Sequence, residues 1–169
     1  TSGWFRVVPW APNTILQVDS YSDRPAWNQA INDNRFKGVI EVRYSTANKK
    51  LWVVNDLNLE DYLKGVSEPL EAGAFEYIKA AVIAERSYIL HHLSKGGRWP
   101  ADNITLKNSR NGNGDDQIYQ GYNFTLRATN IPNAVDATKG EVVTYGGKPV
   151  LTPYYTQSDG RTRSISEVW

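Results

Sequence analysis

The residue best placed for acid–base chemistry in this sequence is Glu68, in the run Gly65-Val66-Ser67-Glu68-Pro69 at the end of a predicted helix. Gly65 weakens that helix and Pro69 limits its continuation, so a carboxylate at the break can point into a cleft. Partial burial would raise the pKa of this carboxyl group, as a general acid requires near neutral pH. A surface glutamate beside a proline is the ordinary alternative, and spacing alone does not exclude it.

A longer helix is predicted over residues 74–92, closing at Gly96-Gly97. Its apolar side chains recur at helical spacing and predict a core-facing stripe made of Phe75, Ile78, Val82, Ile89 and Leu93. Glu85 and Arg86 fall on or beside this stripe, and charged side chains are rarely buried without partners. We therefore expect one of two roles for Arg86. It either forms a buried ion pair that locks the helix, or it orients a catalytic carboxylate or contacts a substrate.

Strands are predicted before these helices. The pair at residues 36–44 and 51–55 is typical of a hairpin, turning through residues 45–50, and shorter strands are expected at residues 4–8 and 14–18. Asn58 then caps a first helix over residues 59–64, which carries acidic residues in its first turn.

After the helices the sequence becomes polar and rich in glycine. Residues 95–116 predict a long surface loop with a short strand at residues 104–106. A short helix is expected around residues 124–129, and strands at residues 141–145 and 150–156 flank a turn at Gly146-Gly147. The sum is an α+β fold, mainly antiparallel β-strands with a two-helix insert that carries the active-site cleft.

The chain has 169 residues, 40% of them hydrophobic, so we expect one domain across residues 1–169. Its net charge of +1 gives no broad field to attract nucleic acid or an anionic membrane. The 6 Trp and 10 Tyr suit a wet surface that binds sugars, although most of these rings can equally belong to a core.

Cysteine is absent, which excludes a disulfide, a thiol nucleophile and a Cys-type zinc site. The neighbouring His91 and His92 would point about 100° apart on a helix, so we expect no metal site. No apolar run is long enough to span a bilayer. The start at Thr1-Ser2-Gly3 looks like a cut point and the end at Trp169 is abrupt, so we expect the natural chain to continue beyond this piece.

Several blocks of the sequence, in the same order, resemble the SpoIID/LytB family. The central blocks are LEDYLKGV at residues 59–66, then Glu68, then EYIKAAVIAERSY at residues 76–88. The family pattern runs roughly L-E-D-Y-L-x-G-V, a Glu in the next turn, and E-A-L-K-A-Q-A-V-A-A-R-T-Y. Later blocks lie at residues 116–121, 134–140, 145–150, 158–162 and 167–169. Residues 1–35, which hold N-terminal strands, match nothing in this pattern and receive no role.

The resemblance implies an extracytoplasmic protein of the bacterial cell wall whose partner is peptidoglycan glycan. The enzymes of the family are lytic transglycosylases that act on glycan strands stripped of stem peptides. They cleave the MurNAc–GlcNAc bond, leave 1,6-anhydro-MurNAc ends, and need no cofactor. The essential glutamate of the family precedes the E of the E-A-L-K block by eight residues, as Glu68 precedes Glu76 here. The likeness therefore implies that Glu68 is the general acid/base.

Further residues are candidates to bind sugar groups or to support the site, and each could equally make a hydrogen bond within the fold: Arg86, Tyr88, Gln117, Tyr119, Ser158 and Thr162. A second carboxylate opposite Glu68 would allow ordinary hydrolysis, and the candidates for it are Glu71, Glu76 and Asp159. Asp159 also departs from the family, which has glycine there, and it adds a side chain beside the expected cleft.

Two other functions remain open. The LytB side of the family is described as an amidase enhancer, which predicts a non-catalytic module that binds glycan and assists a cell-wall amidase. A scaffold domain of an envelope complex is the third hypothesis. The presence of Glu68 favours the enzyme. Sporulation itself is not implied, because the family also occurs in bacteria that do not sporulate.

Overall fold

The computed structural model describes residues 3–109, 116–155, 160–161 and 163–168. The elements follow one another as β1 (Trp4–Val7), β2 (Leu16–Gln17), β3 (Arg35–Phe36), β4 (Val39–Ser45), β5 (Lys50–Asp56), α1 (Leu59–Lys64), α2 (Phe75–Leu93), the short 3₁₀ helix η1 (Pro100–Asp102), α3 (Gly121–Thr125), α4 (Asn130–Ala137), β6 (Thr144–Tyr145), β7 (Lys148–Pro149) and α5 (Ile165–Val168).

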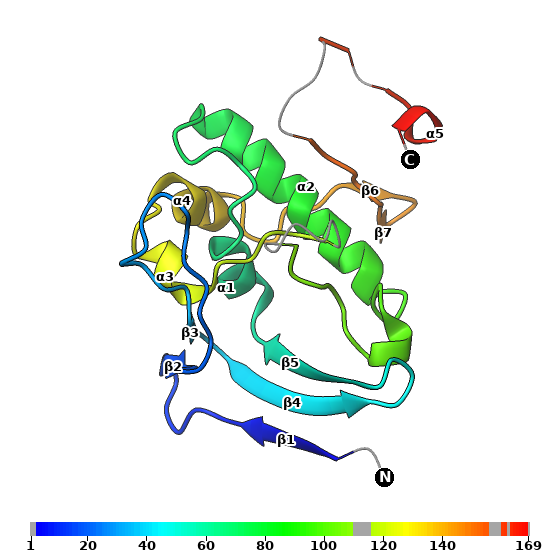
Figure 1. Cartoon of the computed structure of the whole chain (residues 1–169). Coiled ribbons are helices and arrows are strands. Elements are labelled where there is room, and N and C mark those ends of the chain that lie inside the picture. The colour runs from blue at the N-terminus through cyan, green and yellow to red at the C-terminus, as the bar shows by residue number, and fades with distance from the viewer. Residues whose placement is uncertain (1–2, 110–115, 156–159, 162, 169) are drawn as a thin grey trace.

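The largest sheet is antiparallel, with the strand order β1-β4-β5. β4 and β5 pair over their whole length, with Val42 opposite Val53 and Tyr44 opposite Leu51. These β-branched and aromatic pairs stabilise the ladder, and the predicted hairpin is confirmed. β1 adds to the free side of β4, with Phe5 opposite Val42. In Figure 1 this sheet lies along one side of the molecule, with the helices on the other.

The two predicted helices are confirmed. The Asn58 side chain accepts a hydrogen bond from the backbone N–H of Glu60 and caps α1. Along α2, the stripe residues Ile78, Val82 and Ile89 are buried as predicted, and they form one core with residues of α1, α3 and α4.

Phe75 and Leu93 were predicted in the same stripe, and that part of the prediction is wrong, because they are 40% and 48% exposed. These two residues occupy the first and last turns of α2. At 1.5 Å per residue α2 is about 28 Å long and the packed helix α4 about 12 Å, so the ends of α2 extend past their cover.

The C-terminal third departs most from the prediction. A helix was expected at residues 124–129, but α3 ends at Thr125 and α4 follows from Asn130. The carboxylate of Glu71 accepts hydrogen bonds from the backbone N–H groups of Thr129, Asn130 and Ile131 and so caps α4 from a distant part of the chain. A local reading of the sequence cannot find such a cap.

Two predicted strands are also wrong. Ile104 makes only an isolated bridge with Trp99, and the polar loop around it contains η1 instead. β7 ends at Pro149, so residues 150–155 lie outside any strand. They pack along α2, where the Thr152 hydroxyl donates to the carbonyl oxygen of Ala84 at 2.6 Å. The turn at Gly146-Gly147 between β6 and β7 is as predicted.

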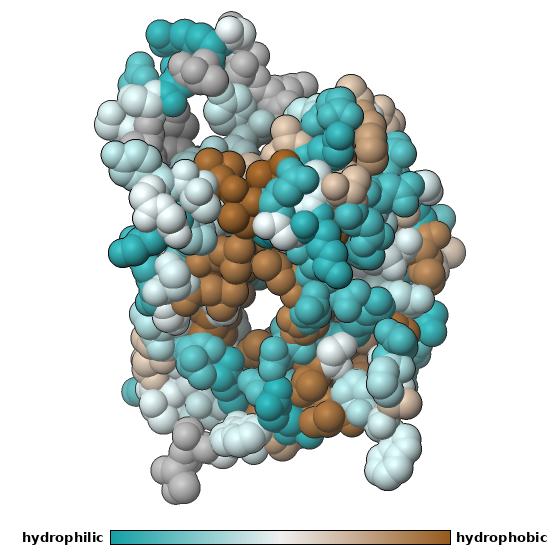
Figure 2. Space-filling model, turned by 180° about the vertical axis from the view of Figure 1, so that it is seen from behind, coloured by the Kyte–Doolittle hydropathy of each residue, from teal (hydrophilic) through white to brown (hydrophobic). Residues whose placement is uncertain are grey.

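The fold is α+β, as expected, although α3 and α4 make its helical part larger than a two-helix insert. Figure 2 shows the face opposite to that of Figure 1, where hydrophobic side chains gather around a central hollow. Within the part of the chain that the structure describes, no helix combines the length and apolar character needed to cross a membrane.

Candidate active site

The chain breaks after α1 because it pairs there with a segment far along the sequence. The Gln120 N–H donates to the Gly65 carbonyl oxygen at 2.8 Å, and the Ser67 N–H donates to the Ile118 carbonyl oxygen at 3.0 Å. Gly65 is required for this approach, because a Cβ at this position would lie 2.4 Å from the ring of Tyr119. These contacts fix the backbone on the N-terminal side of Glu68.

Glu68 extends from this break into a cavity and is partly buried. Its Oε1 accepts a hydrogen bond from the Ile118 N–H at 3.0 Å. Burial raises the pKa of the Glu68 carboxyl, while hydrogen bonds from Tyr154 and Ile118 lower it and the nearby charge of Asp116 raises it. The net effect is a raised pKa, which retains a proton to a higher pH than an exposed glutamate does.

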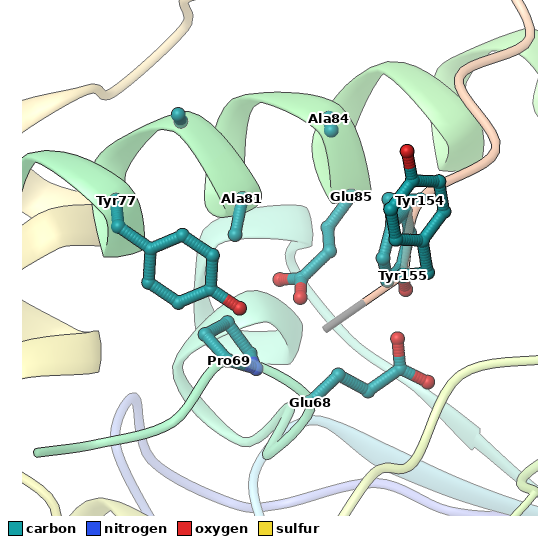
Figure 3. Close-up of a pocket in the computed structure, with 9 residues that line it drawn as sticks. Glu68, Pro69, Tyr77, Ala81, Ala84, Glu85, Tyr154 and Tyr155 are labelled. Carbon is teal, nitrogen blue, oxygen red and sulfur yellow. The ribbon is translucent and has the colours of Figure 1, made fainter. Parts of the chain in front are cut away.

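The cavity beside Glu68 has a volume of about 200 Å³. Ala80, Ala81 and Ala84 of α2 line this cavity, and their small side chains leave the space open. The remaining walls come from the loop after α1, from α2 and from the segment after β7, as Figure 3 shows; they are Pro69, Tyr77, Glu85, Tyr154 and Tyr155.

Glu85 brings a second carboxyl group to this cavity. In Figure 3 its side chain points from α2 toward the side of the cavity that Glu68 occupies. Glu85 is 0% exposed, and neither carboxyl oxygen has a hydrogen-bond partner among the described residues. Burial raises its pKa well above the ordinary value, the charge of Glu68 raises it further, and the charge of Arg86 lowers it. These effects together favour the protonated form of the Glu85 carboxyl.

Arg86 lies on the same turn of α2 but points elsewhere. Its guanidinium donates to both carboxylate oxygens of Glu60 on α1, at 3.0 and 2.7 Å. It also donates to the carbonyl oxygen of Glu141 at 3.1 Å, and the side chain is fully buried. The arrangement is the paired, hydrogen-bonded form that a buried cation requires. In this geometry Arg86 joins helices, and its charge acts on the cavity only through space.

Gln117 lies behind the site, 1% exposed. Its Nε2 donates to the Glu85 carbonyl oxygen at 3.4 Å, and its Oε1 accepts from the Tyr62 hydroxyl at 3.1 Å. Tyr154 is hydrogen-bonded to both Gln117 and Glu68, which places Gln117 one side chain away from the catalytic candidate.

The two tyrosines in the predicted set, Tyr119 and Tyr88, make hydrogen bonds elsewhere in the fold. The Tyr119 hydroxyl donates to Oδ1 of Asn55 at 3.1 Å, and its ring stacks on that of Tyr62 with centroids 4.9 Å apart. The Tyr88 hydroxyl donates to Oδ1 of Asp116 at 3.1 Å, and burial raises its pKa to about 12. Ser158 and Thr162 lie outside the described residues.

The second carboxylates considered from the sequence are placed elsewhere. Glu71 caps α4, and Glu76 is exposed and pairs with Lys79 at 2.7 Å. Asp159 lies outside the described residues. The carboxyl that shares the cavity with Glu68 is instead that of Glu85.

Sequence reasoning found Glu68 but not the partners that shape its cavity. For Glu85 a signal existed, since a charged residue on the core stripe of a helix needs an explanation. A second signal was the run of alanines on the same helix face. For Tyr154 there was none, because its segment was predicted as a strand.

Comparisons with known proteins place the chain in a family. A family model for SpoIID, described as a stage II sporulation protein, matches residues 47–145, a range that includes Glu68, Glu85 and Arg86. An uncharacterized protein of Brachyspira hyodysenteriae (strain ATCC 49526 / WA1) is 32% identical over 128 residues, covering 72% of this chain and 32% of that protein. The stage II sporulation protein D of Bacillus subtilis (strain 168) is 26% identical over 140 residues, covering 75% of this chain and 38% of that protein.

The amidase enhancer of the same Bacillus subtilis strain is 30% identical over 109 residues, covering 63% of this chain and 13% of that protein. The chain thus spans 32% and 38% of the length of the first two relatives and a smaller share of the enhancer. Since the family model covers more than half of the residues, the chain belongs to the SpoIID family.

Proposed function

We propose that this chain is a peptidoglycan lytic transglycosylase that cleaves the MurNAc–GlcNAc bond of glycan strands stripped of their stem peptides. Glu68 is the general acid and then the general base. The observation that carries the proposal is the position of Glu68, whose carboxyl enters a mainly apolar cavity and has a raised pKa. Both properties suit a carboxylic acid that must hold a proton near neutral pH.

The reaction needs only one such group. Protonated Glu68 gives its proton to the oxygen that bridges the two sugars, and the C1–O bond breaks as positive charge develops at C1. The C6 hydroxyl of the same MurNAc then attacks C1, and the Glu68 carboxylate takes the hydroxyl proton. The products are a 1,6-anhydro-MurNAc end and a free GlcNAc hydroxyl, and water is not consumed.

The surroundings of Glu68 fit both halves of this cycle. Burial favours the neutral acid at the start. The Ile118 N–H and the Tyr154 hydroxyl favour the carboxylate that exists between the two proton transfers. Tyr77 and Tyr155 are 38% and 51% exposed beside the cavity and offer flat faces on which sugar rings can stack.

A glycan-binding module that assists a cell-wall amidase is the second candidate, and the similarity to the Bacillus subtilis amidase enhancer favours it. Under either function the chain works outside the cytoplasm on peptidoglycan, and a cell-wall amidase is a candidate partner. The two functions differ in whether Glu68 is needed for turnover.

The test is incubation of the chain with peptidoglycan glycan that an amidase has stripped of peptides, followed by mass spectrometry of the released saccharides. The native chain should release products with anhydro ends. Glu68→Gln should lower the rate by at least about a hundredfold, since general acid–base catalysis contributes about 10²–10⁴. Glu76→Gln, on the exposed surface of α2, is the matched control and should leave the rate unchanged.

The product also separates the mechanisms, because hydrolysis would leave reducing ends in place of anhydro ends. Glycan that is retained by the native chain and by Glu68→Gln alike, with no product from either, would support the enhancer function. An equal rate for the native chain and Glu68→Gln would remove Glu68 from the mechanism.

A further inference from the structure

Glu85 is a buried acid that the single-carboxylate mechanism does not use. Its side chain lines the cavity next to Glu68, it is 0% exposed, and both its carboxyl oxygens lack partners among the described residues. An unpartnered buried carboxyl group is costly, because the desolvation of its polar atoms is not compensated. Such a group calls for a partner that enters the cavity.

The charge state of Glu85 defines what that partner can be. Among the described residues, the cation that lowers its pKa is Arg86, whose guanidinium is bonded to Glu60 and to backbone carbonyl oxygens. Burial and the charge of Glu68 act in the opposite direction and raise the pKa of the Glu85 carboxyl, which favours its protonated form, an O–H donor. An uncharged oxygen acceptor fits this donor.

The rest of the cavity wall is apolar and therefore suits an apolar group of the ligand. Ala80, Ala81, Ala84 and Pro69 surround the space with methyl and methylene groups. The cavity of about 200 Å³ is several times the roughly 30 Å³ that one water occupies in the liquid, so it has room for a small substituent of a sugar. An acetamido group combines a carbonyl oxygen with a methyl group.

We propose that Glu85 determines specificity for N-acetylated sugars by donating a hydrogen bond to the carbonyl oxygen of an acetamido group placed beside Glu68. This inference rests on the proposed function. The acetamido group at C2 of a sugar is next to C1, whose bond to the bridging oxygen Glu68 protonates. A substrate positioned for Glu68 therefore brings this group close to the cavity.

Contact with Glu85 requires part of the cavity wall to move, because the Glu85 carboxyl is closed to bulk water although the cavity itself opens to the surface. Tyr155 forms part of that wall and is 51% exposed, so little packing holds its ring in one rotamer. Exposed side chains change rotamer in picoseconds to nanoseconds.

The experiment compares two neutral tetrasaccharides, chitotetraose and cellotetraose, which differ in having an acetamido group or a hydroxyl group at C2. Binding is measured by calorimetry in the Glu68→Gln background, where cleavage cannot occur. Chitotetraose should bind at least about tenfold more tightly, since one hydrogen bond to a buried donor is worth about that factor.

Adding Glu85→Ala should reduce the preference to about twofold or less by weakening chitotetraose alone, because Ala offers no donor. Adding Glu85→Gln should keep the preference, because its amide is also neutral and donates a hydrogen bond. Thermal unfolding of each variant checks that the fold is intact, and the Gln variant keeps the test decisive if the Ala variant unfolds.

An unchanged preference in Glu85→Ala, or its complete loss in Glu85→Gln, would overturn the assignment of Glu85. In either case glycan cleavage by the native chain would still support the proposed function. If neither tetrasaccharide binds and the native chain releases no product from glycan, the inference and the proposed function fail together.

Discussion

The raised pKa of Glu85 predicts an effect that needs no substrate: the stability gained on changing Glu85 to Gln grows with pH. In the folded chain, burial keeps the Glu85 pKa well above 4.5, the ordinary value of a glutamate, which the unfolded chain retains. Below pH 4.5 both states hold the proton and the raised pKa contributes its full stability. As the pH rises, the unfolded chain loses the proton first, so this contribution declines until the pH reaches the folded pKa.

The size of the effect follows from proton linkage. One proton that is retained only by the folded state lowers the free energy of unfolding by about 1.4 kcal/mol for each pH unit. Glu85→Gln carries no such proton, so its advantage over the native chain should grow by this amount per unit above pH 4.5. The growth should stop at the folded pKa of Glu85. The free-energy difference that accumulates over a few pH units is significant, because small domains are stable by only about 5–15 kcal/mol.

Urea unfolding between pH 4 and pH 8, followed by tryptophan fluorescence, measures this difference, since the chain has 6 Trp. The titratable groups whose pKa values are coupled to Glu85 include Glu68, Tyr62 and Tyr154, and they are present in both proteins. The substitution Glu76→Gln on the exposed face of α2 controls for the amide itself.

A difference between native chain and Glu85→Gln that stays constant over this range would refute the reasoning. It would mean that Glu85 ionises in the folded chain at the same pH as in the unfolded one. The cavity would then present an anion instead of a donor, and recognition of an acetamido carbonyl by Glu85 would lose its basis.

Three further substitutions test how the site is held. Arg86→Met should destabilise the fold by about 3–5 kcal/mol in urea unfolding, because it leaves Glu60 partly buried without its partner; a loss below 1 kcal/mol would show that water replaces the pair. Gly65→Ala should cost about 1–3 kcal/mol, since its Cβ meets the ring of Tyr119, and normal stability would mean that the ring moves freely. Glu71→Ala should cost about 1 kcal/mol through the lost cap of α4, and hydrogen exchange in the first turn of α4 should rise; unchanged exchange would contradict the capping role.

The parts of the fold that sequence predicts well are those with local signals. Asn58 before an acidic first turn marks the start of α1, and Gly65 with Pro69 marks its end. The α2 stripe and the β4–β5 hairpin follow from periodicity and from β-branched residues. Together these signals place Glu68 at a helix break. This position is the main feature of the candidate site that local sequence predicts.

The remainder depends on contacts between distant segments. α4 begins where Glu71 caps it, and the segment with Tyr154 runs along α2 instead of pairing as a strand. Neither contact leaves a periodic pattern in its own neighbourhood. The cavity itself is a joint product of the alanines on α2 and of the Tyr154 segment, so no single stretch of sequence predicts it.

Glu85 and Arg86 show why the unpartnered acid indicates function. Neighbouring side chains on a helix point about 100° apart, so one turn of α2 directs Arg86 toward α1 and Glu85 into the cavity. Both residues are 0% exposed, yet the guanidinium bonds both oxygens of Glu60 and backbone carbonyls, while the carboxyl bonds no described residue. All of the hydrogen bonds described for Arg86 show that this part of the fold is well packed. Poor packing therefore does not explain why the Glu85 carboxyl has no hydrogen-bond partner among the described residues. The missing partner of Glu85 is expected where its side chain points, in the space that a substrate of Glu68 must enter.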